Sequence, residues 1–280
     1  MDYYRRVKKT VQAILKPQIS QRKIKHFIEG SDITELINIR CSPDPTIAVI
    51  VPCFGHEQYL EEMFTCIINQ TRRPDQVIFI DDKSPDKSSE LLSRITESLD
   101  TDFRQIIRII NNEKNIGQSA SINRGITAAD TELILILNDD DYLMHDCIDT
   151  ILQIFKRFPA AVMVGGTSLH FSGESLNNMA KCIGESKKEQ EISIDFREPD
   201  NVKQYSRYND LNMTHSGSCF LKSAWKVVGG YYPDKSKRVA PYSDRDFQIR
   251  INSLFPVAIS NITPLSLWRN DSSVDSGINS

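Results

Sequence analysis

Five carboxylates of this sequence follow directly after two apolar segments, and they are Asp81, Asp82, Asp139, Asp140 and Asp141. The segments before them, 77–80 and 133–137, have the composition of buried strands. Carboxylates that lie close together raise one another's pKa unless a cation compensates their charge. A divalent ion with oxygen ligands, Mg²⁺ or Mn²⁺, is the simplest such cation, and it keeps open positions for substrate phosphates. The pattern therefore predicts a metal site that takes a nucleotide diphosphate.

A structural role for these acids is the alternative hypothesis. A single Asp after a strand is most often a turn former or a helix cap. Asp86, in Ser84-Pro85-Asp86, fits that interpretation as an acid in the first turn of a helix. Capping needs one acid, whereas three in succession follow the segment 133–137, so the metal hypothesis is favoured there.

The elements that would position these acids alternate along the chain from residue 47. Apolar runs typical of strands occupy 47–51, 77–80, 106–110, 133–137 and 160–164. Helical patterns between them occupy 59–69, 86–99, 119–129 and 147–155. This alternation predicts an α/β fold with a mostly parallel central sheet flanked by helices. Ligands of such sheets bind at the carboxyl ends of the strands, where the acids stand.

The second half of the chain is less regular. Residues 172–210 are polar and charged, and they predict an excursion from the sheet, mainly loop with some helix. The predicted helices after it occupy 219–228 and 247–254, and the predicted short strands occupy 257–260 and 265–268.

The chain has 280 residues and a formal net charge of −3, which argues against a dedicated nucleic-acid binder. Residues 1–28 carry eight Lys or Arg and one acid, a net charge of +7 that leaves −10 for the other 252 residues. Apolar spacing in 1–16 and 22–39 predicts a basic helical extension that ends at the linker 42–45. Such an extension suits peripheral contact with an anionic membrane surface through residues 1–28, or packing on the domain or on a partner.

Cysteine usage and hydropathy bear on the compartment. None of the six cysteines forms a C-x-x-C pair, so we expect reduced thiols and no zinc ribbon. No apolar run reaches the ~18 residues of a membrane span, and no apolar segment follows the basic N-terminus as in a secretory signal. These features predict a cytoplasmic protein, at the inner face of the membrane if the extension binds lipid.

Three common motifs are missing from the sequence. There is no G-x-x-x-x-G-K-[ST], the segment 53–57 after the first strand is not G-x-G-x-x-G, and no Ser stands in G-x-S-x-G. P-loop enzymes, dinucleotide-binding enzymes and α/β-hydrolases are therefore disfavoured.

Three stretches together resemble glycosyltransferase family 2, whose members have the GT-A fold. They are AVIVPCFGHEQYLEEMFTCIINQTRRPDQVIFIDDKSPDKS (48–88), NIGQSASINRGITAADTELILILNDDDYL (115–143), and GSCFLKSAWKVVGGYYPD with SDRDFQIRI (within 217–251). The resemblance covers about residues 46–270. It implies a nucleotide-sugar-binding half at 46–143 and an acceptor-binding half at 144–270. The basic extension and linker at 1–45 and a polar tail at 271–280 lie outside it.

The resemblance also implies a donor site. The matching positions that would line it are Pro52, Cys53, Phe54, Glu57, Asp81, Asp82, Asn115, Gly117, Asn123, Asp139 and Arg269. The metal motif of the family falls on 138–140, with Asp140 as the direct ligand of Mn²⁺ or Mg²⁺. Asn138 stands where many members carry Asp, and it still offers an oxygen ligand. Three further residues are secondary candidates for the metal or the sugar, namely Asp141, His215 and Asp271.

The family implies an inverting transfer, for which one carboxylate must take the proton of the acceptor hydroxyl. The matching position is Asp244, although Ser243 replaces the usual Glu before it, and Asp246 is the alternative base. The expected activity is metal-dependent transfer of a sugar from a nucleotide-diphosphate donor, UDP-linked, to a hydroxyl of a glycan or lipid-linked acceptor in polysaccharide or glycoconjugate synthesis.

Two rival functions stay open at this point. A sugar-phosphate nucleotidyltransferase would need a Gly-rich loop with Arg and Lys after the first strand, and 53–57 has none. A scaffold that binds a sugar or nucleotide without turnover is the other rival, and the departures at Asn138 and Ser243 keep that alternative open.

Overall fold

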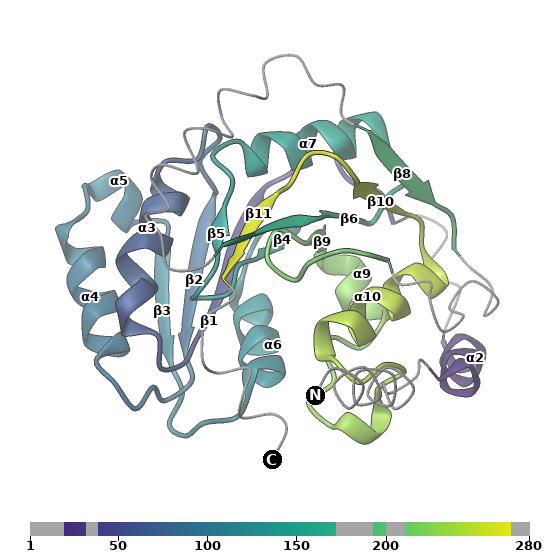
Figure 1. Ribbon diagram of the computed structural model, residues 1–280, viewed down its shortest axis with the longest axis horizontal. Helices are drawn as coiled ribbons and strands as arrows, with labels where there is room; N and C mark the ends of the chain where they lie inside the picture. The colour runs from purple at the N-terminus through teal and green to yellow at the C-terminus, as the bar shows by residue number, and fades with distance from the viewer. Residues whose placement is uncertain (1–19, 32–38, 172–192, 200–210, 270–280) are drawn as a thin grey trace, which may run out of the picture.

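The computed structural model describes residues 20–31, 39–171, 193–199 and 211–269 (Figure 1). The first helical segment of the predicted extension, most of the polar excursion and the tail with Asp271 lie outside the described residues. The described chain forms an eight-stranded sheet and a three-stranded sheet, with helices packed around them.

The first half of the main sheet is parallel, in the order β3-β2-β1-β4. Its strands are β1 (Ile47–Cys53), β2 (Gln76–Asp81), β3 (Ile107–Asn111) and β4 (Leu133–Ile136). The helices between them are α3 (Leu60–Ile68), α4 (Ser88–Ser98), the short α5 (Thr101–Arg104) and α6 (Gln118–Ala128). Figure 1 shows α3 and α4 on one side of these strands and α6 on the other. All residues of β1 and β4 are buried, which explains their continuous apolar runs and confirms the predicted parallel sheet.

The second half of the main sheet continues as β9-β6-β10-β8. Its strands are β9 (Cys219–Leu221), β6 (Met163–Gly166), β10 (Val257–Ser260) and β8 (Ile194–Arg197). Its main helices are α7 (Cys147–Arg157) and α10 (Ser243–Leu254). Because β4, β6 and β10 share one direction, the sheet is mostly parallel, while β9 and β8 run against their neighbours.

Two of the predicted elements in this half are wrong. The helix predicted over 219–228 is β9 followed by the shorter α9 (Lys222–Val227). Three apolar residues have too little periodicity to separate strand from helix, and β9 becomes a strand because it fills the gap between β4 and β6. The excursion predicted as loop with some helix contains β8, which pairs with β10 at the sheet edge.

The small sheet has the order β5-β11-β7, with β5 (Tyr142–Leu143), β11 (Ser266–Arg269) and β7 (Ser168–Phe171). The sequence pattern predicts β11 and misses the other two strands, which are two and four residues long. β5 follows Asp141 directly, and β11 ends at Arg269, so this sheet joins the acidic motif to the end of the described chain.

Part of the basic extension packs on the domain. Helix α2 (Gln21–Gly30) lies against α10, and its Ile24 is fully buried in the common core. Ser20 caps the helix by accepting a hydrogen bond from Lys23 N (3.3 Å), and its own backbone N–H donates to Val239 O (2.8 Å). Residues 20–30 are therefore integrated with α10 and the segment before it.

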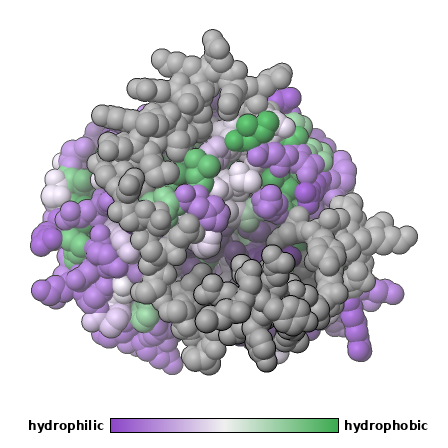
Figure 2. Space-filling view, viewed as in Figure 1, coloured by the Kyte–Doolittle hydropathy of each residue, from purple (hydrophilic) through white to green (hydrophobic). Residues whose placement is uncertain are grey.

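Large exposed hydrophobic side chains are scattered over the described surface. They include Phe54, Ile116, Leu169, Tyr242, Ile262 and Trp268. On the face in Figure 2, hydrophilic residues dominate the described surface and apolar ones form small separate patches. In the part of the chain described, no helix has the length and apolar character that crossing a membrane requires.

Candidate active site

The loops that carry the predicted residues meet at one edge of the main sheet because β1, β2 and β4 are parallel. Cys53 lies opposite Asp81 in the pairing of β1 with β2. The backbone N–H of Phe54 donates to Asp139 Oδ2 (2.9 Å), which ties the loop after β1 to the loop after β4. The strand-end acids of the sequence thus belong to one edge of the folded domain.

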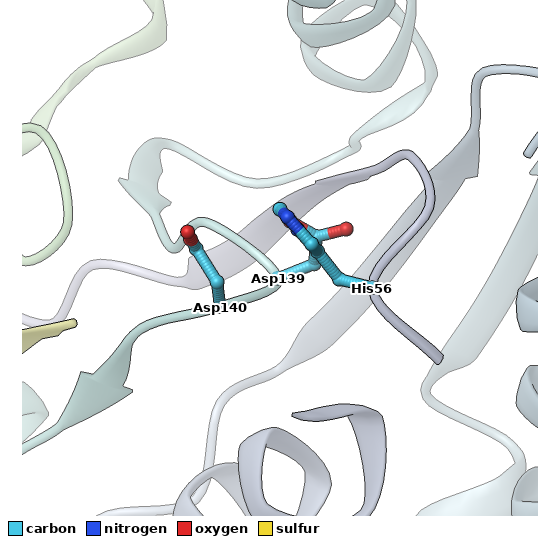
Figure 3. Close-up of side chains that lie close together, drawn as sticks. All are labelled: His56, Asp139 and Asp140. Atoms are coloured by element: carbon cyan, nitrogen blue, oxygen red, sulfur yellow. The ribbon is translucent and has the colours of Figure 1, made fainter. Parts of the chain in front are cut away.

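His56 and Asp139 form a buried hydrogen-bonded pair at this edge (Figure 3). His56 Nδ1 lies 2.9 Å from Asp139 Oδ1, and each side chain is 8% exposed. Burial lowers the pKa of His56, but the hydrogen bond and the charge of Asp139 outweigh it, so the pKa is raised. Burial also raises the pKa of Asp139, with His56 opposing. Both carboxylate oxygens of Asp139 are hydrogen-bonded, one to Phe54 N and one to His56, so Asp139 links the loop after β4 to the loop after β1.

Sequence reasoning does not single out His56. It stands two residues after Phe54 in the loop after β1, far along the chain from the acidic motif. A histidine close to a predicted metal motif is a recognisable ligand type, but its pairing with Asp139 depends on the parallel neighbours β1 and β4. The tertiary structure therefore adds this residue to the site.

The residues at this edge fit a divalent cation. A nitrogen of His56 and one oxygen each of Asp139 and Asp140 lie within 4.8 Å of one another. His56 Nε2 is buried, and no described residue is its hydrogen-bond partner. Asp140 is partly exposed, and no hydrogen bond from the described residues reaches its carboxylate. Buried polar atoms without partners are costly, so an open nitrogen beside an open carboxylate is the donor set that a metal ion would satisfy.

Asn138, the second predicted metal ligand, has its side chain engaged within the protein. Its Oδ1 accepts from Gln118 Nε2 (3.1 Å) and lies 3.2 Å from His215 Nδ1, while its Nδ2 donates to Asp141 Oδ2 (3.1 Å). His215 Nε2 lies 3.3 Å from the hydroxyl of Tyr231. Asn138 and His215 thus connect the acidic motif to Tyr231 in the second half of the chain.

Asp141 is a buried link between three segments. Its Oδ2 accepts from Ser216 Oγ (2.5 Å) as well as from Asn138, and its Oδ1 accepts from the backbone N–H of Arg269 (3.2 Å). Burial and the neighbouring Asp140 carboxylate raise the pKa of Asp141 to about 7. Asp141 holds the motif against β11.

The neighbouring acids Asp81 and Asp82 have different surroundings. Asp82 accepts from Asn112 Nδ2 (2.7 Å) and from the backbone N–H groups of Ile116 and Gly117 (2.8 Å each). It therefore fixes the loop before α6, where Gly117 has a positive φ of 85°. The Asp81 carboxylate accepts only the long bonds from Ser84 N (3.3 and 3.4 Å) among the described residues, so it has capacity for a ligand.

Other predicted donor-site residues are buried in β1 or hydrogen-bonded to the loops around the site. Pro52 and Cys53 are buried in β1, and burial raises the pKa of the Cys53 thiol. Glu57 Oε2 accepts from Lys87 N (2.7 Å) at the start of α4. Asn115 Oδ1 accepts from Gly117 N (3.1 Å).

Asn123 joins α6 to the second half of the chain. Its Oδ1 accepts from Trp225 Nε1 (3.1 Å) and from Tyr231 N (2.9 Å), and its Nδ2 donates to Tyr231 O (2.7 Å). Phe54, by contrast, is 37% exposed and follows Cys53, the residue that lies opposite Asp81.

Arg269 lies beside the metal motif with its guanidinium enclosed. It donates to the Asp140 carbonyl (3.0 Å) and to Glu62 Oε2 (2.8 Å). The guanidinium carbon lies 3.9 Å from the ring centroid of Tyr59 and 4.5 Å from that of Phe171. A phosphate bound at the metal motif would lie within reach of this guanidinium and would compete with Glu62 for it.

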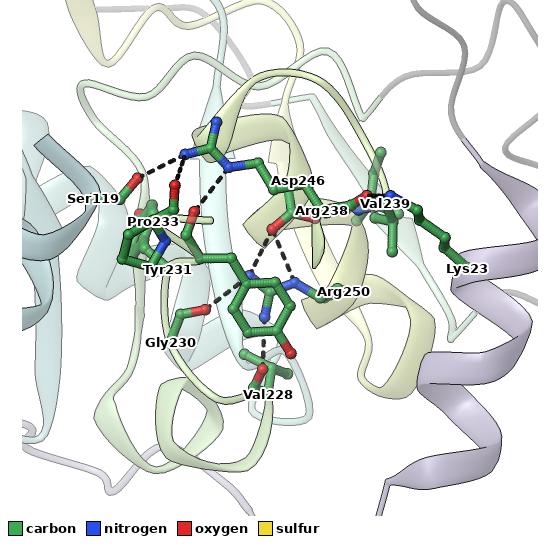
Figure 4. A network of polar contacts seen from close by, with 12 residues as sticks. Lys23, Ser119, Val228, Gly230, Tyr231, Pro233, Arg238, Val239, Asp246 and Arg250 are labelled. Atoms are coloured by element: carbon green, nitrogen blue, oxygen red, sulfur yellow. Dashed lines mark hydrogen bonds and ion pairs between the residues drawn. The ribbon is translucent and has the colours of Figure 1, made fainter. Parts of the chain in front are cut away.

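The two candidate bases differ in availability. Asp246 is fully buried, its Oδ1 accepts from Val239 N (2.6 Å), and its Oδ2 accepts from Arg250 Nε and Nη2 (3.0 and 2.7 Å; Figure 4). The alternative base is therefore a core residue. Asp244 is partly exposed in the first turn of α10. Burial lowers the pKa of His215, and the charge of Asp244 opposes this shift.

The sheet order and the strand-end acids define a GT-A-type glycosyltransferase domain, and solved structures share the fold. S. aureus TarS 1-349 in complex with UDP-GlcNAc aligns with a TM-score of 0.56 at 15% identity, covering 81% of this chain and 59% of that one. The mannosyltransferase PcManGT from Pyrobaculum calidifontis, in complex with GDP-Man and Mn²⁺, aligns with a TM-score of 0.55 at 16% identity, covering 89% and 63%.

The family follows from the sequence comparison. The family model described as glycosyl transferase family 2 matches residues 48–223, and the chain belongs to that family. The glycosyltransferase GlyG of Streptococcus pneumoniae is 31% identical over 119 residues, 42% of this chain and 38% of that protein. A GalNAc(5)-diNAcBac-PP-undecaprenol beta-1,3-glucosyltransferase of Campylobacter jejuni is 29% identical over 158 residues, 50% of each protein. The chain thus spans about half or less of the length of these relatives.

Proposed function

We propose that this protein is a metal-dependent inverting glycosyltransferase that moves a sugar from a UDP-linked donor to a hydroxyl of a glycan or lipid-linked acceptor. The observation that carries the proposal is that a family 2 domain keeps two acids without a described hydrogen-bond partner: Asp140, grouped with His56 at the sheet edge, and Asp244 in the first turn of α10. Family membership disfavours the nucleotidyltransferase rival.

The donor half would bind the nucleotide through the open groups at its strand ends. The exposed ring of Phe54 would stack on the base, and Asp81 would accept hydrogen bonds from the base or the ribose. A divalent cation, Mn²⁺ or Mg²⁺, held at Asp140 supplies charge stabilisation for the departing diphosphate. Arg269, beside the Asp140 carbonyl, would hold a phosphate oxygen.

The acceptor half would supply the base. Asp244 would take the proton of the acceptor hydroxyl as that oxygen attacks the sugar carbon in line with the departing phosphate. Asp246 holds the start of α10 by its bonds to Val239 and Arg250, and so fixes the turn that carries Asp244. Asp141, Asn138 and His215 would keep the two halves in register.

The relatives support the substrate classes. TarS is solved with UDP-GlcNAc and PcManGT with GDP-Man and Mn²⁺, which supports a nucleotide-sugar donor and a metal. The Campylobacter jejuni relative is named for an undecaprenol-diphosphate-linked acceptor, which supports a lipid-linked one here. A UDP donor is the hypothesis that we put first.

The test is release of free nucleotide from a panel of UDP-sugars and GDP-Man with Mn²⁺, with and without candidate acceptors. We expect turnover with one UDP-sugar and a loss of about 10²- to 10⁴-fold in Asp244→Asn, because the general base is removed. Asp130→Asn, an exposed acid at the opposite end of α6, is the matched control and should keep full turnover. Binding without turnover would support the scaffold, and full activity of Asp244→Asn would refute the base.

We also propose peripheral membrane contact through the basic extension, at the cytoplasmic face. Within residues 1–28, Lys23 bonds the carbonyls of Ser236 and Arg238, and Ile24 is in the core, so the contact would use the basic residues before α2. Those residues are Arg5, Arg6, Lys8, Lys9 and Lys16. Flotation with anionic liposomes should carry the unaltered protein and lose the variant with these five residues changed to Gln. Equal flotation of the two proteins would refute the contact.

A further inference from the structure

The sequence offers four side chains at 138–141 as metal ligands, but in the folded protein most of their oxygens are already hydrogen-bonded. The Asn138 oxygen already accepts from Gln118 and faces His215, and both oxygens of Asp139 are bonded. Asp141 is likewise occupied on both oxygens. Asp140 is left with an open carboxylate, and one carboxylate is a weak site for a divalent ion.

His56 offers a second ligand atom at the same place. Its Nδ1 is paired with Asp139, and its Nε2 is buried without a partner among the described residues. The histidine on the other side of the motif, His215, has both nitrogens within hydrogen-bond distance of partners. Of these two histidines, His56 alone therefore presents an open nitrogen.

The Asp139–His56 pair has the form of a metal-binding unit. Histidines that bind metals commonly donate the other ring N–H to a carboxylate, which fixes the tautomer and makes the ligating nitrogen more basic. With Nδ1–H donated to Asp139, the lone pair of Nε2 is free, and a nitrogen of His56 lies within 4.8 Å of an Asp140 oxygen. The arrangement is pre-formed because both side chains are buried.

We propose that His56 Nε2 and the Asp140 carboxylate are the protein ligands of the divalent cation, with Asp139 as the positioning residue for His56. The proposal rests on the proposed glycosyltransferase function and names the ligands of that same site. Magnesium prefers an all-oxygen shell, whereas imidazole suits transition metals. A nitrogen ligand therefore predicts a preference for Mn²⁺ over Mg²⁺.

The test is pulsed electron paramagnetic resonance of Mn²⁺ bound to the full chain with UDP, which detects a directly bound imidazole nitrogen. We expect nitrogen modulation in the unaltered protein and in His26→Gln, whose histidine is exposed on α2. We expect its loss in His56→Gln, together with a fall in Mn²⁺ affinity of about 10-fold or more, and a smaller change in Mg²⁺ affinity. Asp139→Asn should lower the affinity for Mn²⁺ by about 10- to 100-fold, because His56 loses the carboxylate that positions it.

Several outcomes would overturn the assignment. Absence of nitrogen modulation in the unaltered protein would do so without any variant, so misfolding cannot hide the result. If His56→Gln lost Mn²⁺ and Mg²⁺ affinity equally, or lost affinity for UDP in the absence of metal, the contact of Nε2 would be with a phosphate oxygen and not with the cation. Turnover of a nucleotide-sugar with Mn²⁺ but without nitrogen modulation would leave the proposed function standing, whereas failure to bind any nucleotide-sugar would refute that function itself.

Discussion

The Asp246–Arg250 cluster and the His56–Asp139–Asp140 cluster use similar residues to different ends. Arg250 is fully buried, and its guanidinium donates to Asp246 and to the carbonyls of Val228 and Gly230 (Figure 4). The guanidinium carbon also lies 3.7 Å from the ring centroid of Tyr232. At the sheet edge, His56 Nε2 and the Asp140 carboxylate have no described partner (Figure 3). Saturated bonding marks a cluster that holds the fold, and incomplete bonding marks one that awaits a ligand.

The saturated cluster should be the more costly one to break. Asp246→Ala leaves the buried Arg250 without its counter-charge, and we expect a loss of about 3–5 kcal/mol in the free energy of unfolding. Urea denaturation measures it, with Asp130→Ala at an exposed position as control. A loss below about 1 kcal/mol would mean that the pair does not stabilise the fold as its bonding suggests.

The open cluster should show the opposite pattern. Asp140→Ala removes a carboxylate that no described residue bonds, so unfolding should change by less than about 0.5 kcal/mol. Turnover with Mn²⁺ should fall about 100-fold, equivalent to about 2.7 kcal/mol in the barrier, because charge stabilisation of the diphosphate is lost. Initial rates and thermal melts of the same preparation give both numbers. Retained turnover would remove Asp140 from the site.

The adjacent residues Asp81 and Asp82 show the same contrast between an open carboxylate and a fully bonded one. Asp82→Ala leaves Asn112 and two backbone N–H groups without their acceptor, and it should cost about 1–3 kcal/mol of stability. Asp81→Ala should cost less stability and instead weaken UDP binding. Denaturation and calorimetric titration of UDP with both variants separate these effects, and a reversed result would exchange the two roles.

The smallest expected effect is a pH dependence from His215. Its pKa is lowered from 6.5 by burial, with Asp244 opposing. As the pH falls below about 6.5, the unfolded chain takes up this proton before the native protein does, so stability is lost on the acid side. We expect the unaltered protein to lose stability relative to His215→Gln between pH 7.5 and 5.5, measured by denaturation at each pH. His145→Gln, at an exposed position, is the control, and a difference that does not vary with pH would contradict the prediction.

The sequence predicts the first half of the fold closely because its strands are local apolar runs, of which β1 and β4 are buried throughout. It fails at β9, β5 and β7, which span three, two and four residues and exist as strands only through their partners. In the site, the strand-end acids are visible in the sequence. The saturation of Asp82, Asn123 and Asp246 is not, because their partners are backbone groups of other loops.

The sequence by itself determined the parallel sheet, the position of the acids at its carboxyl edge and the family, because strand period and motif spacing are properties of the chain. The tertiary structure decided which acids are open and which are bonded. It brought His56 to Asp139, turned Asn138 toward Gln118 and His215, and placed part of the basic extension on α10. Those pairings join residues far apart along the chain, so they follow from strand order and packing, and local sequence pattern carries no record of them.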